Sequence, residues 1–320
     1  MTLPLQPPLK PQLALSRKEL PAGEDLAYEI KLDGFRCLAF VDGEEVFLQS
    51  RSGKPLGRYF PELVLPPGRY VLDGEIVVRG QDGREDFDAL GQRIHPAASR
   101  IERLSVETPA VYVVFDLLAR EDESLLERPL SERRAALERL LAVDPAFAVA
   151  PVELIETVAT VDEAARWLAH AEGAIAKERS ARYRSGERKG TFKVKRVRTI
   201  DAVLVGWRPG KEPDTVGALI LGLYDGPELR VVGHCSGLTV AEKRRLVGFL
   251  APYESGERGS ADPSRWSAGK ELEWVGLRPE LVVEIDFDHV SAGRIRHGAK
   301  LRRWREDKPA AECTFDQLAA

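Results

Sequence analysis

The stretch Glu29–Arg36 reads EIKLDGFR and lies between two apolar runs that predict β-strands. Lys31 has an apolar neighbour on each side, and a lysine in an apolar strand is costly unless its charge has a task. A lysine amine is a nucleophile only when neutral, and burial or nearby cations can lower its pKa far enough. Asp33-Gly34 predicts a turn that returns Arg36, whose planar fork suits phosphate or ribose oxygens. The stretch therefore predicts either a nucleophilic lysine or an ordinary hairpin.

Composition and charge indicate a globular protein of about two domains. The 320 residues are 43% hydrophobic and 31% charged, and the net charge is −4. No run reaches the ~18–20 apolar residues of a membrane span, so no membrane association is expected. Met1–Pro11 is proline-rich, lacks the pattern of a secretion signal and predicts an extended arm. Cys37, Cys235 and Cys313 lie far apart and form no zinc or disulfide pattern, which favours a reducing, cytoplasmic setting.

Two apolar runs contain acids that a buried strand rarely holds without a partner. Arg69–Arg79 reads RYVLDGEIVVR, with Asp73–Glu75 (DGE) at its centre. A hairpin turn at the Asp-Gly pair is one explanation, although the apolar run after it would then begin with the glutamate. Val111–Leu118 is another apolar strand with one internal acid, and Phe115 beside that acid has a core position as its structural alternative.

Turn, capping and periodicity signals predict further local structure. The predicted features are a hairpin turn at Asp42-Gly43, a helix over Pro129–Ala142, a helix opened by the Thr160-x-x-Glu163 capping box and running to Glu172 before Gly173, and a linker over Arg196–Ile200.

The run Lys177–Arg198 carries ten lysines and arginines against two acids, in a chain whose net charge is negative. A solvated loop is the usual structural explanation of a charge run. At its end, however, period-two alternation puts Lys193 and Lys195 on one face of a strand and apolar side chains on the other. Two lysines ~6–7 Å apart repel unless an anion lies between them, and a polyphosphate is such an anion.

The part after the linker predicts a small β-domain. Strands are expected at Ala202–Trp207, Gly217–Tyr224, Leu229–Gly237 and Leu281–His289, with a capped helix over Thr239–Leu250. Short strands with one helix fit an OB-type barrel, a fold typical of nucleic-acid binding. Arg294–Arg305 holds six lysines and arginines in twelve residues, and His297 within this tail is expected at the surface.

Lys31-x-Asp33-Gly34-x-Arg36 resembles the nucleotidyl-lysine motif of the ligase and capping-enzyme superfamily. In that superfamily the lysine attacks the α-phosphate of a nucleotide and keeps the nucleoside monophosphate. Further segments resemble its other motifs in the same order: Ser50–Gly53, Asp73–Glu75, Phe115-Asp116, Glu172–Lys177, Lys193–Lys195 and Arg305–Lys308. The tail segments Arg303–Pro309 and Ala311–Thr314 look most like bacterial stand-alone ATP-dependent DNA ligases of the C type, which are related to the ligase module of end-joining enzymes.

The resemblance covers Pro11–Leu318 and implies an α+β fold. Residues 1–197 would form a nucleotidyltransferase, or adenylation, domain of antiparallel sheets with flanking helices. Residues 198–320 would form an OB-fold β-barrel. Neither a separate N-terminal DNA-binding domain nor the zinc site and N-terminal domain of NAD-dependent ligases is expected.

The resemblance implies an ATP-dependent DNA ligase that seals nicks in duplex DNA through a lysine–AMP intermediate and an adenylated 5′-phosphate, in DNA repair or recombination. Lys31 is the implied catalytic nucleophile. The implied nucleotide-binding residues are Glu29, Ile30, Arg36, Arg51, Glu75, Phe115, Lys193, Lys195, Arg305 and Lys308. The implied ligands of Mg²⁺ (or Mn²⁺) are Glu75 and Glu172. The implied contacts with the DNA backbone are Arg182, Arg184, Arg188, Lys189, Arg302 and Arg303.

The resemblance also implies individual roles and a setting. Phe115 would stack on adenine, Glu29 would meet its edge, and the Arg305–Lys308 segment would contact the triphosphate leaving group. The implied partners are nicked duplex DNA and end-joining or repair proteins, and the expected state is a monomer in the cytoplasm at the nucleoid.

Three alternatives stay open at this point. An RNA ligase or a capping-type guanylyltransferase shares the lysine motif and the fold, and ATP versus GTP or DNA versus RNA nicks would separate them. A non-catalytic nucleic-acid-binding module on the same fold is disfavoured, because a decayed site would lose charges that are costly to keep. A generic β-rich DNA-binding protein with chance motifs is the third.

Overall fold

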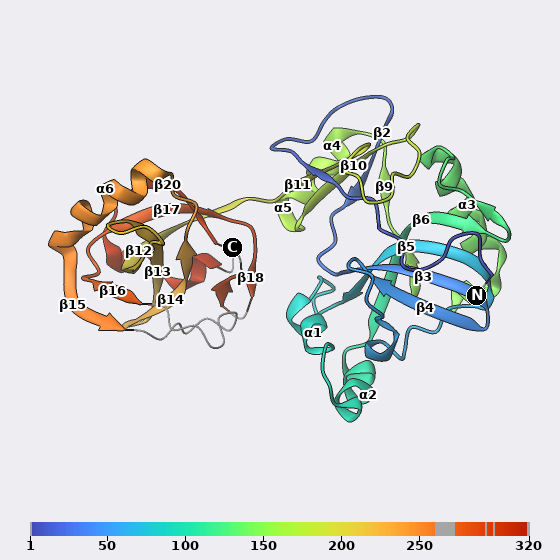
Figure 1. The fold of residues 1–320 in the computed structure, drawn as a ribbon, viewed down its shortest axis with the longest axis horizontal. Coiled ribbons are helices and arrows are strands. Elements are labelled where there is room, and N and C mark those ends of the chain that lie inside the picture. Colours follow the sequence, from blue (N-terminus) through green and yellow to red (C-terminus); the bar gives the residue numbers. More distant parts are fainter. Residues whose placement is uncertain (1, 260–272, 292, 297, 319–320) are drawn as a thin grey trace. The chain divides into compact units, whose positions relative to one another are not determined.

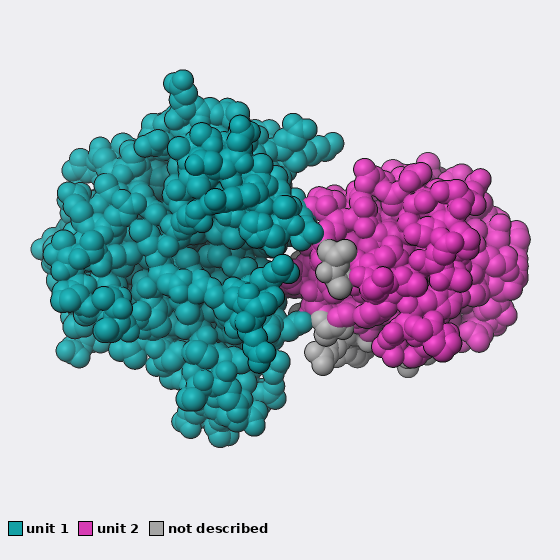
Figure 2. All heavy atoms as spheres, turned by 180° about the vertical axis from the view of Figure 1, so that it is seen from behind, with its two compact units in different colours: residues 1–196 teal, residues 197–320 magenta. Residues whose placement is uncertain are grey.

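The computed structural model of the chain describes residues 2–259, 273–291, 293–296 and 298–318. The chain forms two compact units, Met1–Arg196 and Val197–Ala320, shown in Figure 1 as ribbons and in Figure 2 as two colours. Each unit buries hydrophobic side chains of its own. Nowhere in the described ranges does a helix have both the length and the hydropathy that crossing a bilayer requires.

The larger sheet of the first unit has six strands. They are β3 (Phe35–Gly43), β4 (Glu45–Ser50), β5 (Gly68–Val78), β6 (Ala110–Arg120), β7 (Glu123–Ser124) and β8 (Val152–Leu154). The order is β4-β3-β5-β6-β7 with antiparallel pairing throughout, and β8 joins β6 in parallel. This continuous sheet carries the acids of the DGE segment in its interior.

Both faces of this sheet are buried, because successive side chains of a strand point to opposite faces. In β3, Ala39 and Val41 pack into the main core of the unit. Leu38 and Phe40 face the other way and pack with Leu3 of the N-terminal arm. The extended arm is therefore part of the folded unit, and burial on two faces explains why these strands are almost continuously apolar.

The smaller sheet of the first unit has five strands. They are β1 (Leu15–Ser16), β2 (Leu26–Ile30), β9 (Thr157–Val158), β10 (Gly173–Glu178) and β11 (Thr191–Lys195), in the order β1-β11-β10-β2-β9. Side chains from β2 and β10 form a buried cluster with Trp167 of the adjoining helices. This sheet brings the segment before Lys31 next to the strand that follows Glu172.

Short helices flank the sheets (Figure 1). The α-helices are α1 (Phe87–Gln92), α2 (Ala98–Glu107), α3 (Leu130–Val143), α4 (Val161–Ala165), α5 (Trp167–His170) and α6 (Val240–Leu250). The 3₁₀ helices are η1 (Gly57–Tyr59), η2 (Pro145–Ala148), η3 (Ala251–Tyr253), η4 (Ala310–Glu312) and η5 (Phe315–Leu318). Helix α3 packs on β6, and the predicted capping boxes open α4 and α6.

The second unit is an antiparallel β-structure with one α-helix in its described part. Its strands are β12 (Arg198–Pro209), β13 (Val216–Asp225), β14 (Glu228–Cys235), β15 (Glu254–Gly259), β16 (Trp274–Leu277), β17 (Val282–Phe287), β18 (Val290–Ser291), β19 (Arg294–Ile295) and β20 (Lys300–Trp304). The long strand β12 pairs with β13, β16 and β17, and the side chains of these strands share one core. Antiparallel sheets with flanking helices confirm the predicted α+β class.

Two local predictions about the first unit are wrong in detail. Strand β2 ends at Ile30, so Lys31 lies just beyond the strand rather than within it. The first hairpin turns at Gly43-Glu44 instead of one residue earlier, because Asp42 still pairs with Glu45. Gly43 has a φ of +65°, a conformation that glycine adopts without steric cost.

Two predicted element ends also differ from the structure. The helix expected to reach Glu172 is divided at Arg166 and ends at His170. The backbone oxygen of Glu172 instead accepts a hydrogen bond from the N–H of Arg196 at 2.8 Å, which holds this segment beside a strand. The predicted linker is also too long, since β12 begins at Arg198.

The glycine of the DGE segment is explained by packing rather than by a turn. Strand β5 runs straight through Gly74, whose missing side chain makes room for the ring of Tyr112 on β6. A Cβ atom there would lie 2.6 Å from that ring and 2.6 Å from the carbonyl oxygen of Val113. The hydroxyl of Tyr112 donates to the carbonyl oxygen of Cys37 at 2.9 Å, so the ring is held in place.

We expect Gly74→Ala to lower the free energy of unfolding of the first unit by ~1–3 kcal/mol, because neither the backbone nor the bonded ring can move aside cheaply. Urea denaturation measures this change. Gly57→Ala is the matched control, since no heavy atom lies within 4 Å of its Cβ position. Equal stability of the two variants would contradict the packing explanation.

Candidate active site

A pocket of about 1180 Å³ opens between the two sheets of the first unit. Residues from the N-terminal arm, both sheets and the basic run line it. The predicted site residues on its wall are Glu29, Ile30, Lys31, Arg36, Arg51, Glu75, Phe115, Arg182, Arg188 and Lys193. The fold thus brings together side chains that are spread over more than 160 positions of the sequence.

Lys31 is fixed directly after the end of β2 in the smaller sheet. Its backbone N–H donates to the carbonyl oxygen of Gly173 at 3.0 Å, which continues the pairing of β2 with β10. Its Nζ forms an ion pair and a hydrogen bond with Glu172 Oε2. The Nζ of Lys195 lies 3.5 Å from Glu172 Oε1, so one carboxylate lies between two lysines. The side chain of Lys31 is 17% exposed, which leaves it open to the pocket.

Positive charge converges on the same place from three segments. Lys193 lies opposite Ile175 in the sheet and points to the pocket. Burial lowers the pKa of Lys193, and the positive charges of Lys31, Lys195 and Arg51 lower it further. Positive charges that lower the pKa of a neighbouring lysine in this way are stabilised by an anion placed among them. The arrangement is suited to a polyphosphate.

Glu75 adds a second carboxylate to the pocket. Burial raises its pKa to about 7, an effect that Arg36 and Lys31 oppose and that Asp73 and Glu172 strengthen. In the sheet Glu75 lies opposite Arg36. Its negative charge is therefore held at a cost near neutral pH, which a bound cation would relieve.

Phe115 lies under two cations instead of in the main core. It is 7% exposed and lines the pocket. The guanidinium carbon of Arg36 is 4.5 Å from its ring centroid, and the Nζ of Lys177 is 4.2 Å from it. Lys177 also pairs with Glu29 Oε2 at 2.6 Å, which places Glu29 beside this ring.

Three functional candidates were not predicted from the sequence: Lys177, Asp73 and Tyr183. Asp73 accepts hydrogen bonds from Nε and Nη2 of Arg36, at 2.5 and 2.7 Å. The hydroxyl of Tyr183 donates a further hydrogen bond to Asp73 Oδ2 at 2.7 Å. These bonds orient the guanidinium of Arg36 over Phe115. The available signals were the position of Lys177 at the end of the Glu172–Lys177 motif and the acid next to Gly74.

The predicted DNA-contacting residues of the first unit surround a second, shallower hollow. Arg182, Arg184, Arg188 and Lys189 line it. Arg182 pairs with Glu127 at 2.6 Å, and Lys189 pairs with Glu187 at 3.0 Å. Gln12 fixes this segment, because its side-chain amide donates to the carbonyl oxygen of Lys189 and accepts from the N–H of Arg184.

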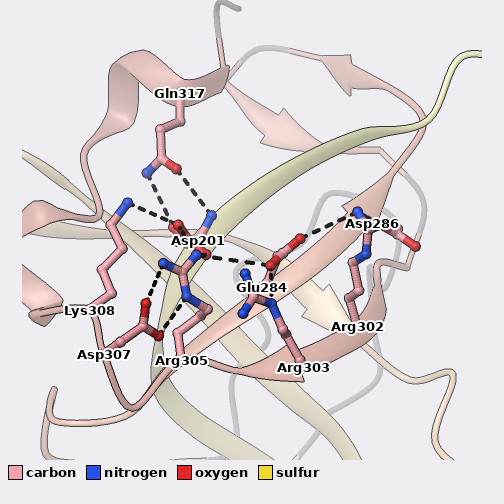
Figure 3. A network of polar contacts seen from close by, with 9 residues as sticks. All are labelled: Asp201, Glu284, Asp286, Arg302, Arg303, Arg305, Asp307, Lys308 and Gln317. Atoms are coloured by element: carbon pink, nitrogen blue, oxygen red, sulfur yellow. Dashed lines mark hydrogen bonds and ion pairs between the residues drawn. The ribbon is translucent and has the colours of Figure 1, made fainter.

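The remaining predicted site residues belong to the second unit and are paired with acids there (Figure 3). Arg305 and Lys308 both bond to Asp201. Arg303 bonds to Glu284 at 2.6 Å, and the nearest oxygen of Glu284 lies 3.3 Å from Arg302. His297 lies outside the described residues.

The family described as "ATP dependent DNA ligase domain" matches residues 11–195, which include every part of the pocket. The family described as "ATP dependent DNA ligase C terminal region" matches residues 212–308. The chain belongs to the ATP-dependent DNA ligase family. This confirms the resemblance drawn from the sequence, and the fold and activity class that it implied.

Curated relatives agree with this assignment. DNA ligase C2 of Mycolicibacterium smegmatis is 44% identical, over 99% of this chain and 96% of the relative. DNA ligase C of Mycobacterium tuberculosis is 42% identical, over the same shares. Among solved structures, "mycobacterial DNA ligase D complexed with ATP and MES" is 29% identical with a TM-score of 0.52, over 96% of this chain and 98% of that one.

The donor set of the pocket fits a magnesium ion shared with a nucleotide. In the described ranges no three His, Cys, Asp or Glu side chains gather as a self-sufficient metal site. Mg²⁺, however, is commonly bound by one or two carboxylates together with substrate phosphates. Glu75 and Glu172 are such carboxylates, and the charge of Glu172 helps to raise the pKa of Glu75.

The raised pKa of Glu75 predicts a pH-dependent stability. On unfolding, the pKa of Glu75 returns from about 7 towards the ordinary 4.5. Between these two pH values the folded protein therefore holds one proton more than the unfolded chain. The free energy of unfolding therefore falls as pH rises through this window, by roughly 1.4 kcal/mol per unit from this group. We expect Glu75→Gln to remove that decline. Urea denaturation of both proteins between about pH 4 and 8 measures it, and two parallel curves would contradict it.

Proposed function

We propose that this ligase seals nicks in duplex DNA, and that Lys31 carries AMP between its two substrates. The observation that supports this most strongly is the convergence of Lys31, Lys195 and Arg51 around Lys193, which lines the pocket, with Glu172 between two of the lysines. A nucleophile that attacks a phosphate must be surrounded by positive charges that bind the phosphate oxygens. Residues 1–197 are proposed as the adenylation domain and residues 198–320 as the OB-fold domain.

In the first step Lys31 Nζ forms a bond to the α-phosphorus of ATP, the bond to the β-phosphate breaks, and pyrophosphate leaves. The amine attacks in its neutral form, and Glu172, which contacts it, is the nearest acceptor for its proton. Lys193 and Lys195 hold the phosphates. The hydrogen bond from the backbone N–H of Lys31 to β10 supports this role, because it holds the nucleophile in one position.

A magnesium ion, when bound, would neutralise the charge that develops on the phosphate oxygens. Glu172 and Glu75 are proposed to hold it.

The base and the sugar of the nucleotide are proposed to lie against Phe115. Its ring offers an aromatic surface beside Glu29 and Lys177, and Glu29 can accept a hydrogen bond from the exocyclic amine of adenine. Ile30 lines the same wall, and Arg36, held by Asp73, lies at the ribose end. The pairing of Glu29 with Lys177 fixes the carboxylate for this contact.

The second and third steps use the DNA. An oxygen of the 5′-phosphate at a nick attacks the α-phosphorus and releases Lys31, and the 3′-hydroxyl then attacks the 5′-phosphorus and releases AMP. Contacts through the DNA backbone are proposed for Arg182, Arg184, Arg188, Lys189, Arg302 and Arg303. Arg305 and Lys308 are proposed to bind the β- and γ-phosphates in the first step. A protein that contacts only the DNA backbone suits repair, because nicks arise in any sequence. The proposed state is a monomer in the cytoplasm at the nucleoid.

An RNA ligase or a guanylyltransferase shares the lysine chemistry. Both are disfavoured by the match of the two DNA ligase families and by the DNA ligase relatives along almost the whole chain. Sealing of nicked DNA with ATP and magnesium, compared with GTP, NAD and nicked RNA, separates the candidates.

The central test is Lys31→Ala. We expect no radiolabelled protein–AMP adduct from α-labelled ATP, because the only atom proposed to bond to phosphorus is gone. The same variant should still seal a nick that already carries AMP on its 5′-phosphate, since the lysine acts only before that stage. Lys18→Ala, at an exposed lysine, is the control and should form the adduct normally. Adduct formation by the Lys31 variant would refute the assignment.

The proposed DNA contacts predict a salt-dependent affinity. We expect Arg188→Ala to weaken binding of nicked DNA equally for unrelated sequences, and to reduce the slope of log K against log salt by about 0.9. The exposed Arg139 on α3 supplies the control, since Arg139→Ala should leave the slope unchanged. Fluorescence anisotropy at several salt concentrations measures both. An unchanged slope for the Arg188 variant would remove it from the interface.

A further inference from the structure

A carboxylate lies nearly buried in the second unit, where its charge needs partners. Asp201 belongs to β12, between the core residues Ile200 and Ala202, and the residue as a whole, backbone included, is 9% exposed. Taking a carboxylate out of water is costly unless cations and hydrogen-bond donors replace the water. The partners of Asp201 are therefore built into the fold.

Two cations meet on this one carboxylate (Figure 3). Nη1 of Arg305 lies 2.8 and 2.9 Å from its two oxygens, and Nζ of Lys308 lies 2.9 Å from Oδ2. The hydrogen bond to Asp201 raises the pKa of Lys308, which keeps that side chain charged. Two positive charges share the negative charge of Asp201, and the remaining positive charge is balanced by Asp307, which also pairs with Arg305.

The backbone of Asp201 is clamped from the C-terminal segment. Its N–H donates to Oε1 of Gln317 at 3.1 Å, and Nε2 of Gln317 donates to its carbonyl oxygen at 3.2 Å. On the opposite side β12 pairs with β17, where Glu284 is its register partner. The carboxylate therefore has a fixed position, to which the two cations adjust.

The other edge of the Arg305 guanidinium is covered by a single exposed side chain, that of Asp307. Nε and Nη2 each lie 2.9 Å from an oxygen of Asp307, whose side chain is 65% exposed, whereas that of Asp201 is 12% exposed. The hydrogen bonds from Arg305 lower the pKa of Asp307 to about 2. An anion that arrives from solvent can replace the exposed Asp307 and leave the bonds to Asp201 intact.

We infer that Asp201 is a positioning residue for ATP binding. It holds Arg305 and Lys308 side by side, so that both contact the β- and γ-phosphates of ATP while their bonds to Asp201 persist. This inference rests on the proposed role of Arg305 and Lys308 in the first step. The competing explanation is an ion pair that only stabilises the barrel. The two explanations differ in which reaction step depends on Asp201.

The test is Asp201→Asn in the full chain, an exchange that removes the charge and keeps the shape. We expect the rate of adduct formation at low ATP to fall about tenfold, with a raised KM for ATP, because two charge-assisted contacts lose their common anchor. Sealing of a pre-adenylated nick should change by less than about twofold, since that step needs no ATP. An equal loss in both steps would show a purely structural role and overturn the inference.

Glu284→Gln is the matched control. It removes the same charge from the facing strand, where Glu284 bonds to Arg303 and reaches Arg305 only through an ion pair at 3.9 Å, too long for a hydrogen bond. We expect its KM for ATP to rise by less than about twofold. An equal rise in KM for both variants would assign the effect to the general charge of the barrel and contradict the inference.

Thermal melting decides whether the Asp201 variant is folded. If it is not, Gln317→Ala replaces it, because that change removes the clamp and no charge. A raised KM for ATP with normal sealing of the pre-adenylated nick supports the inference, and an unchanged KM overturns it. A wild-type protein that forms no adduct would refute the proposed function itself. A wild type that forms adduct, with both variants unaltered, would refute only the role of Asp201.

Discussion

The ion pair between Lys31 and Glu172 is the interaction on which the candidate active site depends. It joins the residue that follows β2 to the residue that precedes β10, at the point where the backbones of these strands also bond. Lys195 approaches the same carboxylate from β11. A single acid thus limits the repulsion among several lysines, and the remaining positive charge is directed into the pocket. A nucleotide phosphate can replace some of the ion-pair contacts that Glu172 makes with these lysines.

The two sheets of the first unit act as a rigid frame for these charges. Antiparallel pairing fixes each strand against the next through regularly spaced backbone hydrogen bonds, so the side chains inherit a defined spacing. Asp73 is buried in the larger sheet and holds the guanidinium of Arg36 over the ring of Phe115. Buried residues behind the pocket therefore orient the side chains that line it, which favours a site that reorganises little during the reaction.

The second unit uses the same physical device with different residues. Arg305 and Lys308 both bond to Asp201, and Arg303 bonds to Glu284 (Figure 3). The two acids lie on neighbouring strands of one sheet. In both units, cations suited to phosphate are kept in place by acids that lie in strands or, for Glu172, directly before one. Such pairing lowers the cost of holding charge in a partly buried place and gives the cations a defined direction.

The sequence by itself determined the family, the α+β class and the order of the functional segments, because these depend on local patterns such as strand alternation, capping boxes and short motifs. It also indicated that Lys193 and Lys195 share a face. Only the tertiary structure decided which acid meets which cation: Asp73 with Arg36, Lys177 with Glu29 and Asp201 with Lys308. These partners come from separate elements, and strand register, which sets their distance, arises from pairings between segments far apart in the chain.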